Sequence, residues 1–152
     1  MNNLPPTVFV DIDGTLVKFE ESIPGLVRKC KFYTNHMADV LPGSSEKLSE
    51  WHQKGIRIIL VTGRPESMRE LTIKQLTCVG MIWDQLIMGC GSGVRYLIND
   101  IPDVKTPKAW AININRNEGI GNLDLDKMVE GQWEQAYRET IDARAKVDKN
   151  EK

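Results

Sequence analysis

The sequence predicts an α/β fold of three layers, in which helices cover both faces of a parallel sheet. Short apolar runs alternate along the chain with longer segments of helical spacing, and this alternation is typical of βαβ units. Several apolar runs also end directly in polar, turn-forming residues. Ligands bind at the carboxyl ends of the strands in sheets of this kind, so these polar ends are the first place to look for a site.

The amino-terminal half contains two expected strands separated by one expected helix. The apolar run Thr7–Ile12 predicts a buried strand, and Ile56–Val61 predicts a second. Between them, Glu46–Gln53 carries apolar residues at helical spacing, with Ser44 or Ser45 as its expected N-cap.

The remaining elements follow the same alternation. Residues Glu66–Thr77 have the apolar spacing of a helix, and the segment near 124–147 has it again. Three further strands are expected at Gln85–Met88, Arg95–Ile98 and Ala109–Ile114. We therefore expect one domain over residues 1–152, with a short flap near 18–40 and a carboxyl-terminal helix.

Composition limits the classes of function. The 152 residues carry a net charge of −1, which gives no electrostatic support for a nucleic-acid or membrane partner. The amino terminus has no basic region followed by a long apolar run, and no stretch is apolar enough to span a membrane. The expected location is cytoplasmic.

Carboxylates stand where two of the expected strands end. Asp11 and Asp13 end the first strand, and Asp100 follows another. Neighbouring carboxylates need a cation or a proton to neutralise them, and oxygen ligands without His or Cys suit Mg²⁺. Thr62 offers a hydroxyl and Gly63 a backbone N–H to an anion.

These groups together predict a phosphate site. Arg95 could supply the positive charge that a bound anion needs. One carboxylate could attack phosphorus to form an aspartyl-phosphate while the other handles protons. Positioning and charge stabilisation would do most of the rest.

Three segments resemble the motifs of one known family, and they occur in that family's order. DIDGTLV, residues 11–17, resembles the first motif of the haloacid dehalogenase superfamily, DxDGTL. VTGR, residues 61–64, resembles its second motif, and LIND, residues 97–100, its acidic motif. The resemblance implies a Rossmann-like parallel sheet. An Asp two residues after the nucleophile is typical of the superfamily's phosphatases.

The resemblance also implies a role for each residue. Asp11 would be the nucleophile and a Mg²⁺ ligand, and Asp13 the general acid and base, with its backbone carbonyl on the metal. Thr62 and the Gly63 N–H would hold the phosphoryl group, and Asp100 would complete the metal site. The candidates, by role, are catalytic Asp11, Asp13, Thr62 and Arg95, phosphate-binding Thr62, Gly63, Arg95 and Lys105, and metal-binding Asp11, Asp13 and Asp100.

Two departures from the family pattern leave questions open. Asn99 stands where the acidic motif has Asp or Gly, which would weaken Mg²⁺ binding. The cation of the third motif is ambiguous, with Arg95 as first choice, then Lys105 and Lys108. Arg64, next to the second motif, is a candidate for contact with substrate instead.

The expected enzyme is uncapped, because neither usual insertion point has room for a cap domain. The segments concerned are Val17–Leu41 and Val79–Asp84. An open site could accept a macromolecular phosphate, or a small one enclosed by a neighbouring subunit of a homo-oligomer. Residues 116–118 could contact substrate or cap the last helix.

The segment GVRYLIND…KAWAININRNEGI resembles small uncapped phosphatases placed near sugar-phosphate pathways. The expected substrate is therefore a sugar phosphate or a similar small metabolite. One alternative is a phosphatase acting on the 5′ or 3′ ends of nucleotides or nucleic acid. Another is a binding or regulatory protein that keeps the fold with weakened catalysis.

Overall fold

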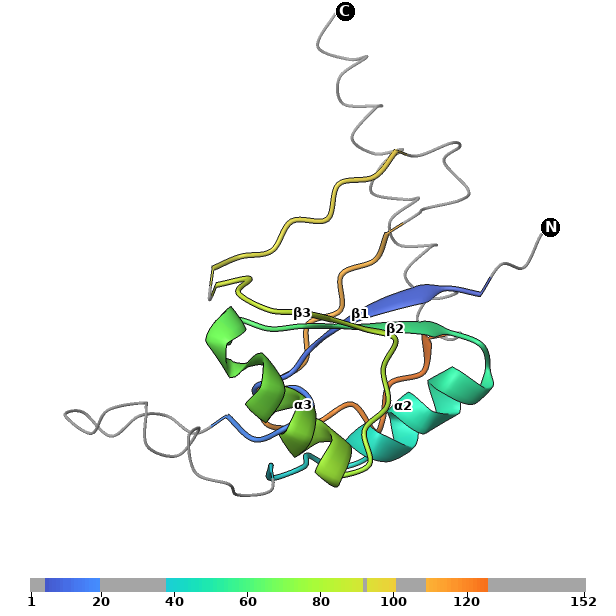
Figure 1. The fold of residues 1–152 in the computed structure, drawn as a ribbon. Helices are drawn as coiled ribbons and strands as arrows, with labels where there is room; N and C mark the ends of the chain where they lie inside the picture. Colours follow the sequence, from blue (N-terminus) through green and yellow to red (C-terminus); the bar gives the residue numbers. More distant parts are fainter. Residues whose placement is uncertain (1–4, 20–37, 92, 101–108, 126–152) are drawn as a thin grey trace, which may run out of the picture. The chain divides into compact units, whose positions relative to one another are not determined.

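The computed structural model describes residues 5–19, 38–91, 93–100 and 109–125. The chain divides into two compact units, and the positions of its parts relative to one another are not determined (Figure 1). The first unit consists of Met1–Gly93 and Ile114–Asn122, and the second of Val94–Asn113 and Leu123–Lys152.

The first unit contains a three-stranded parallel sheet in the order β1-β2-β3. Its strands are β1 (Thr7–Asp11), β2 (Arg57–Val61) and β3 (Gln85–Ile87). Asp11 lies beside Val61, and Val61 beside Ile87, so the three strands end together at one edge of the sheet. The first three predicted strands are thus confirmed to within one residue at either end.

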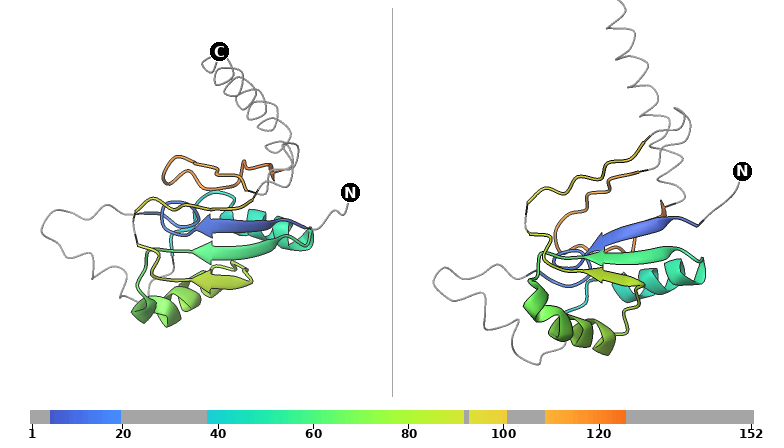
Figure 2. Two further views of the ribbon diagram at one scale, coloured as in Figure 1. Left: turned by 90° about the horizontal axis from the view of Figure 1, so that it is seen from above. Right: turned by 45° about the horizontal axis from the view of Figure 1, so that its top comes forward.

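Two helices connect these strands. Helix α2 (Ser44–Gln53) joins β1 to β2, and the 3₁₀ turn η1 (Glu66–Met68) leads into α3 (Arg69–Cys78), which joins β2 to β3. Both helices lie on the same face of the sheet (Figures 1 and 2). Right-handed crossovers that add strands in one direction place their helices on one face. The chain has the expected α/β, Rossmann-like arrangement, and the helical layer expected on the other face stays a prediction, because none of the described helices lies there.

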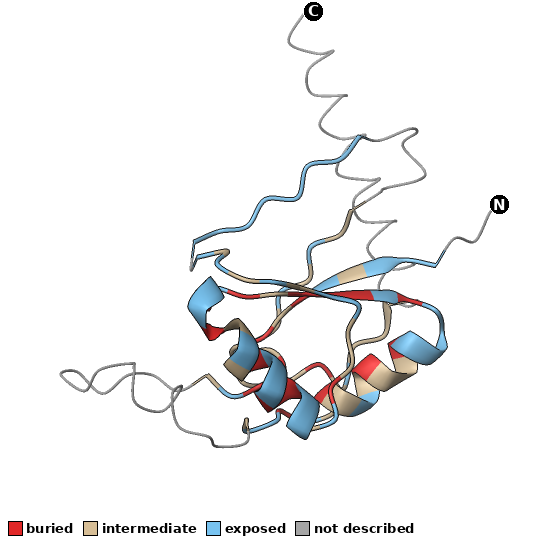
Figure 3. Cartoon of the chain, viewed as in Figure 1, coloured by how far each residue is buried: buried red, intermediate tan, exposed pale blue. Residues whose placement is uncertain are grey.

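The core lies between this face of the sheet and the two helices (Figure 3). Leu48 and Trp51 of α2 and Leu76 of α3 are buried, as are Ile58 and Leu60 of β2. These side chains fix the helices against the sheet and hold the carboxyl ends of the strands in place. The predicted flap and the predicted carboxyl-terminal helix fall largely outside the described residues.

The predicted N-cap of α2 is wrong. Gly43 occupies the capping position with φ of 70°, no side chain caps the helix, and Ser44 and Ser45 lie inside its first turn. A Cβ on Gly43 would stand 2.4 Å from the Cα of Gly121. The close approach of a distant segment therefore requires glycine at the position that precedes this helix.

The predicted fourth and fifth strands are also wrong. Neither Arg95–Ile98 nor Ala109–Ile114 belongs to a sheet in the described part of the chain. Val94, Tyr96 and Ile98 are strongly exposed, whereas a strand of a parallel sheet is normally covered on both faces.

No helix among the described residues is long and apolar enough to cross a membrane.

Candidate active site

A tight turn after β1 presents the two carboxylates. The carbonyl oxygen of Ile12 accepts three backbone N–H groups at 2.9–3.3 Å, those of Thr15, Leu16 and Val17. Ile12 is fully buried, whereas the residues on either side of it, Asp11 and Asp13, are only partly buried. The alternation of DIDGTL therefore anchors the turn in the core through its apolar residues and leaves both carboxylates at the sheet edge.

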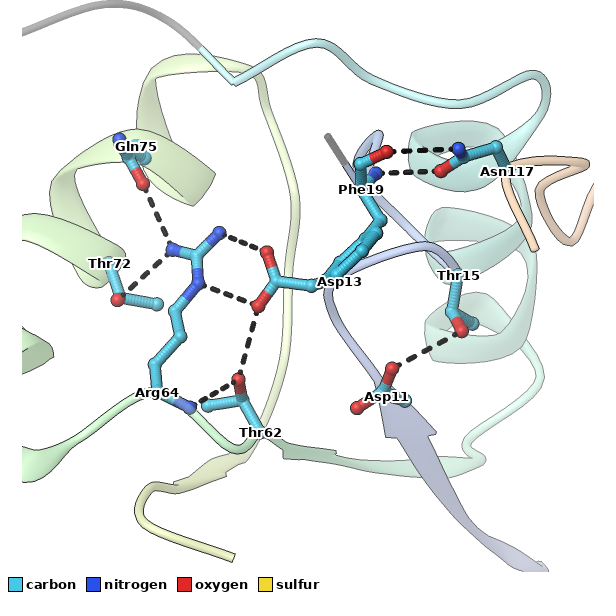
Figure 4. A network of polar contacts seen from close by, with 9 residues as sticks. All are labelled: Asp11, Asp13, Thr15, Phe19, Thr62, Arg64, Thr72, Gln75 and Asn117. Carbon is cyan, nitrogen blue, oxygen red and sulfur yellow. Dashed lines mark hydrogen bonds and ion pairs between the residues drawn. The ribbon is translucent and has the colours of Figure 1, made fainter. Parts of the chain in front are cut away.

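The two carboxylates have different neighbours. The Thr15 hydroxyl lies 3.5 Å from Oδ2 of Asp11, at the limit of a hydrogen bond. The carboxylate of Asp13 points instead toward Arg64 and Thr62 (Figure 4). The pair expected to divide nucleophilic and proton-transfer roles is thus held by two separate sets of contacts.

Thr62 lies at the same edge because it directly follows β2. Val61 is in register with Asp11, and the next residue, Thr62, is 1% exposed. Its hydroxyl accepts the backbone N–H of Arg64 at 3.1 Å and lies 3.4 Å from Oδ2 of Asp13. The structure therefore brings Asp11, Asp13 and Thr62 together, as the sequence predicted.

Arg64 makes a paired, charged contact with Asp13. Its Nε donates to Oδ2 of Asp13 at 2.9 Å and its Nη2 to Oδ1 at 2.7 Å. Its Nη1 donates to Oγ1 of Thr72 at 3.1 Å and to Oε1 of Gln75 at 2.9 Å, both on α3 (Figure 4). Arg64 is only 7% exposed, and its side chain binds Asp13 and α3. The contact with substrate that the sequence suggested stays a prediction.

The loop after β3 holds the backbone of the second motif. Gly89 donates its N–H to the carbonyl of Arg64 at 2.8 Å, and Cys90 donates to that of Thr62 at 3.0 Å. A Cβ on Gly63 would stand 2.7 Å from the carbonyl oxygen of Gly91. The absence of a side chain at position 63 is what lets this loop approach the site.

A segment distant in sequence holds the turn after β1 from the other side. The side chain of Asn117 accepts the N–H of Phe19 at 2.6 Å and donates to its carbonyl at 3.0 Å. The backbone N–H of Asn117 donates to the carbonyl of Gly14 at 2.8 Å. The Arg116 guanidinium lies 4.4 Å from the centre of the Phe19 ring, a distance at which a cation is attracted to an aromatic face.

The structure does not test where the remaining predicted residues lie relative to this edge. Arg95, Asn99 and Asp100 belong to the second unit, and Lys105 and Lys108 lie outside the described residues. Among the described residues, no three His, Cys, Asp or Glu side chains converge on one point. The metal set that includes Asp100 and the choice of the third-motif cation stay predictions.

Residues 8–84, just over half of the chain, match the family model of haloacid dehalogenase-like hydrolases. The chain belongs to this family. The match covers the first two motifs, β1 from Val8 onward and all of β2, and it ends at the residue before β3. No curated protein sequence matches this haloacid dehalogenase-like hydrolase.

Solved structures similar to the hydrolase include a target protein from Vibrio cholerae, with 17% identity and a TM-score of 0.49 over 89% of this chain and 98% of that one. A chain of the Pnkp1/Rnl/Hen1 complex has 25% identity and a TM-score of 0.46, over 63% of this chain and 32% of its own. The D,D-heptose 1,7-bisphosphate phosphatase of B. bronchiseptica, complexed with magnesium and phosphate, has 19% identity and a TM-score of 0.40, over 58% and 51%. All three TM-scores lie below 0.5, so the family assignment rests on the match to the family model.

Two polar residues of the hydrolase that contact the site, Thr72 and Gln75, were missed in the sequence. Their spacing gives no signal without Arg64 as partner. Asn117 belongs to residues 116–118, which the sequence named as candidates for substrate contact or helix capping, and the structure shows it bound to Phe19. Its φ of 66° is one that Asn adopts more readily than most residues.

Proposed function

We propose that this haloacid dehalogenase-like hydrolase is a phosphatase that cleaves a phosphomonoester through an aspartyl-phosphate on Asp11. The observation that carries the proposal is the shared edge of β1 and β2, where Asp11, Asp13 and Thr62 meet. A carboxylate nucleophile, a second carboxylate for proton transfer and a hydroxyl donor are the groups that such a two-step hydrolysis requires.

In the first step, an oxygen of the Asp11 carboxylate attacks phosphorus and the bond from phosphorus to the ester oxygen breaks. The leaving alcohol takes a proton from the carboxylic acid form of Asp13. The Thr62 hydroxyl lies 3.4 Å from the Asp13 carboxylate, so a phosphoryl group held by Thr62 would have Asp13 beside it. Hydrogen bonds to the phosphoryl oxygens stabilise the charge that spreads over them in the transition state.

In the second step, water attacks the phosphorus of the aspartyl-phosphate. Asp13, now a carboxylate, accepts the proton of this water, and the bond from phosphorus to the Asp11 oxygen breaks. Inorganic phosphate leaves, Asp11 is again a carboxylate and Asp13 is again an acid, so the cycle closes without another reactant.

The donor atoms of the site fit Mg²⁺. The Asp11 carboxylate and the backbone carbonyl of Asp13 are hard oxygen ligands, with Asp100 as the proposed third, and Mg²⁺ favours ligands of this type. When bound, the ion would neutralise phosphate charge and orient the phosphoryl group toward Asp11.

The proposed substrate is a small phosphorylated metabolite such as a sugar phosphate. The net charge of −1 gives no general attraction for a polyanion, which binding to nucleic acid normally uses. A 3′- or 5′-phosphorylated oligonucleotide is the comparison that tests this choice.

The experiment is phosphate release from an aryl phosphate, a panel of sugar phosphates and a phosphorylated oligonucleotide, with and without Mg²⁺. We expect Mg²⁺-dependent release by the wild type, no release above the buffer blank by Asp11→Asn, and unchanged release by Asp39→Asn. The control makes the same chemical change at an exposed aspartate. Full activity of Asp11→Asn would refute the aspartyl-phosphate, and preference for the oligonucleotide would refute the substrate class.

A further inference from the structure

We infer that Arg64 is the positioning residue for Asp13, and that Thr72 and Gln75 fix Arg64 in turn. The inference rests on the proposed function, because it assigns a purpose to the contacts of the residue that would transfer protons. It gives α3 a role in the site, which is to hold Arg64, although α3 supplies no residue to the three motifs.

The Asp13 carboxylate has both of its oxygen atoms engaged by one guanidinium. Parallel contacts of 2.9 and 2.7 Å join Nε to Oδ2 and Nη2 to Oδ1. Such paired, charge-assisted bonds fix direction as well as distance. Arg64 therefore holds the Asp13 side chain in one orientation.

The other side of the guanidinium is fixed by α3. Nη1 donates to both Thr72 and Gln75, and all three residues are buried. A buried donor that loses its partner keeps the full cost of leaving water. Arg64 therefore cannot turn away from Asp13 without leaving buried polar groups unpaired.

The contact between Arg64 and Asp13 lies beside the hydroxyl that is proposed to bind the phosphoryl group. Oδ2 of Asp13, which accepts from Nε of Arg64, is also the oxygen nearest the Thr62 hydroxyl. Thr62 accepts the backbone N–H of Arg64 as well. The backbone N–H of Arg64 thus binds the proposed phosphoryl-binding hydroxyl of Thr62. The side chain of Arg64 binds the proposed proton-transfer carboxylate of Asp13.

The chain offers a matched control five residues away. Arg69 makes a similar paired contact through Nε and Nη2, but with Glu66 on the exposed surface. Its Nη1 also donates to the carbonyl of Leu86 in β3 at 3.1 Å. Removing either guanidinium deletes one paired carboxylate contact, and only the Arg64 pair includes a site residue. Exposed pairs of this kind contribute little to stability.

The test measures kcat and KM of the wild type, Arg64→Met, Arg64→Lys, Asp13→Asn and Arg69→Met on substituted phenyl phosphates. The substituents range from p-nitro to p-methoxy, so the leaving group becomes more basic while its shape hardly changes. A misplaced general acid affects the more basic leaving groups most. We expect Arg64→Met to lower kcat on p-methoxyphenyl phosphate by about 100-fold, with a much smaller loss on p-nitrophenyl phosphate and little change in KM.

The other variants show whether the loss in Arg64→Met comes from a misplaced Asp13. Asp13→Asn should steepen the leaving-group dependence in the same way, and Arg69→Met should leave it unchanged. Arg64→Lys keeps the charge without the planar fork, so it should recover part of the loss. Equal losses across the series, or none, would overturn the inference while leaving the proposed function intact.

A second readout does not depend on turnover. In the NMR spectrum of the arginine side chains, the Arg64 Nε–H should exchange slowly with water in the wild type and in Asp11→Asn, and rapidly in Asp13→Asn. An Arg64 signal that Asp13→Asn does not change would overturn the anchoring even if Arg64→Met failed to fold. Absence of phosphate release from the wild type would count against the proposed function, and this spectrum would still decide whether Arg64 holds Asp13.

Discussion

Asn117 holds the loop that follows Asp11 through three hydrogen bonds. Two join its side-chain amide to the backbone of Phe19, and the third joins its own N–H to the carbonyl of Gly14. Gly14 has φ of 90°, and a Cβ there would stand 3.0 Å from Cγ of Arg116. The turn that carries Asp13 is therefore fitted closely to a segment about a hundred positions further along the chain.

Replacing Asn117 with Gly should lower the free energy of unfolding by about 1–3 kcal/mol, because the partly buried N–H and carbonyl of Phe19 lose their partners. Glycine accepts the φ of 66° at this position without strain, so Asn117→Gly isolates the side-chain hydrogen bonds. Asn117→Ala should cost about 1 kcal/mol more because of that φ. Urea unfolding of the three proteins measures both differences, and equal stability of Asn117→Gly and wild type would contradict the first.

The sequence predicts where Asp11, Asp13 and Thr62 lie better than it predicts the residues that hold them. Asp11, Asp13 and Thr62 follow from local pattern, because each stands where an apolar run ends. The partners of Asp13 depend on how α3 is rotated against the sheet, and local pattern carries little of that information. A buried arginine bound to Thr72 and Gln75 was therefore not foreseeable.

At the scale of the element, the helix expected at Glu66–Thr77 shows that apolar spacing alone does not decide which side chains are buried. The apolar residues of this segment are Met68, Leu71, Ile73 and Leu76. Met68 and Leu76 are buried, but Ile73 is 39% exposed. The buried face instead includes two polar residues that bind Arg64, and satisfying a buried guanidinium outweighs covering one more isoleucine.

The difference between local pattern and distant partners also explains which of the predicted strands form. The runs that became β1, β2 and β3 were predicted to within one residue at either end, since each is apolar and bounded by turn residues. Arg95–Ile98 has a similar composition and does not pair in the described chain. Strand pairing depends on a distant partner as much as on local preference, and the sequence alone does not supply that partner.

Helix α2 carries a surface ion-pair network with a predictable pH dependence. Hydrogen bonds from Lys47 and then Lys54 hold the pKa of Glu50 below its ordinary value of 4.5. A carboxylate with a lowered pKa in the folded state adds stability above its unfolded pKa and loses it as the pH falls through the folded value.

Glu50→Gln should therefore be less stable than the wild type at neutral pH, by a small amount because the group is exposed. The difference should shrink as the pH falls below 4.5 and vanish once Glu50 is protonated in both states. Thermal unfolding of both proteins at a series of pH values measures it, and a difference that grew in acid would contradict the assigned sign.

At the scale of the whole molecule, a late segment closes against the start of α2. A Cβ on Gly43 would stand 2.4 Å from the Cα of Gly121, and one on Gly119 would stand 2.6 Å from the carbonyl oxygen of Pro42. Ile120, between these two late glycines, is 1% exposed. The segment that carries Asn117 is thus fixed at its far end by backbone packing that only glycine permits.

Gly43→Ala tests this packing, and Gly55→Ala is its matched control. Both glycines have a left-handed backbone, with φ of 70° and 73°, but a Cβ on Gly55 would meet nothing within 4 Å. Each variant bears the cost of a left-handed alanine, about 1–2 kcal/mol. Gly43→Ala should lose about 1–3 kcal/mol more, because its methyl group forces the late segment outward.

A displaced late segment would also disturb Asn117 and, through it, the turn that carries Asp13. Gly43→Ala should therefore lower kcat for phosphate release as well as stability, whereas Gly55→Ala should lower stability alone. Urea unfolding and steady-state hydrolysis of p-nitrophenyl phosphate measure the two effects on the same samples. If both variants lose equal stability and keep full activity, the Gly43–Gly121 contact does not position the site, and the turn after β1 must be held by its own hydrogen bonds to the Ile12 carbonyl.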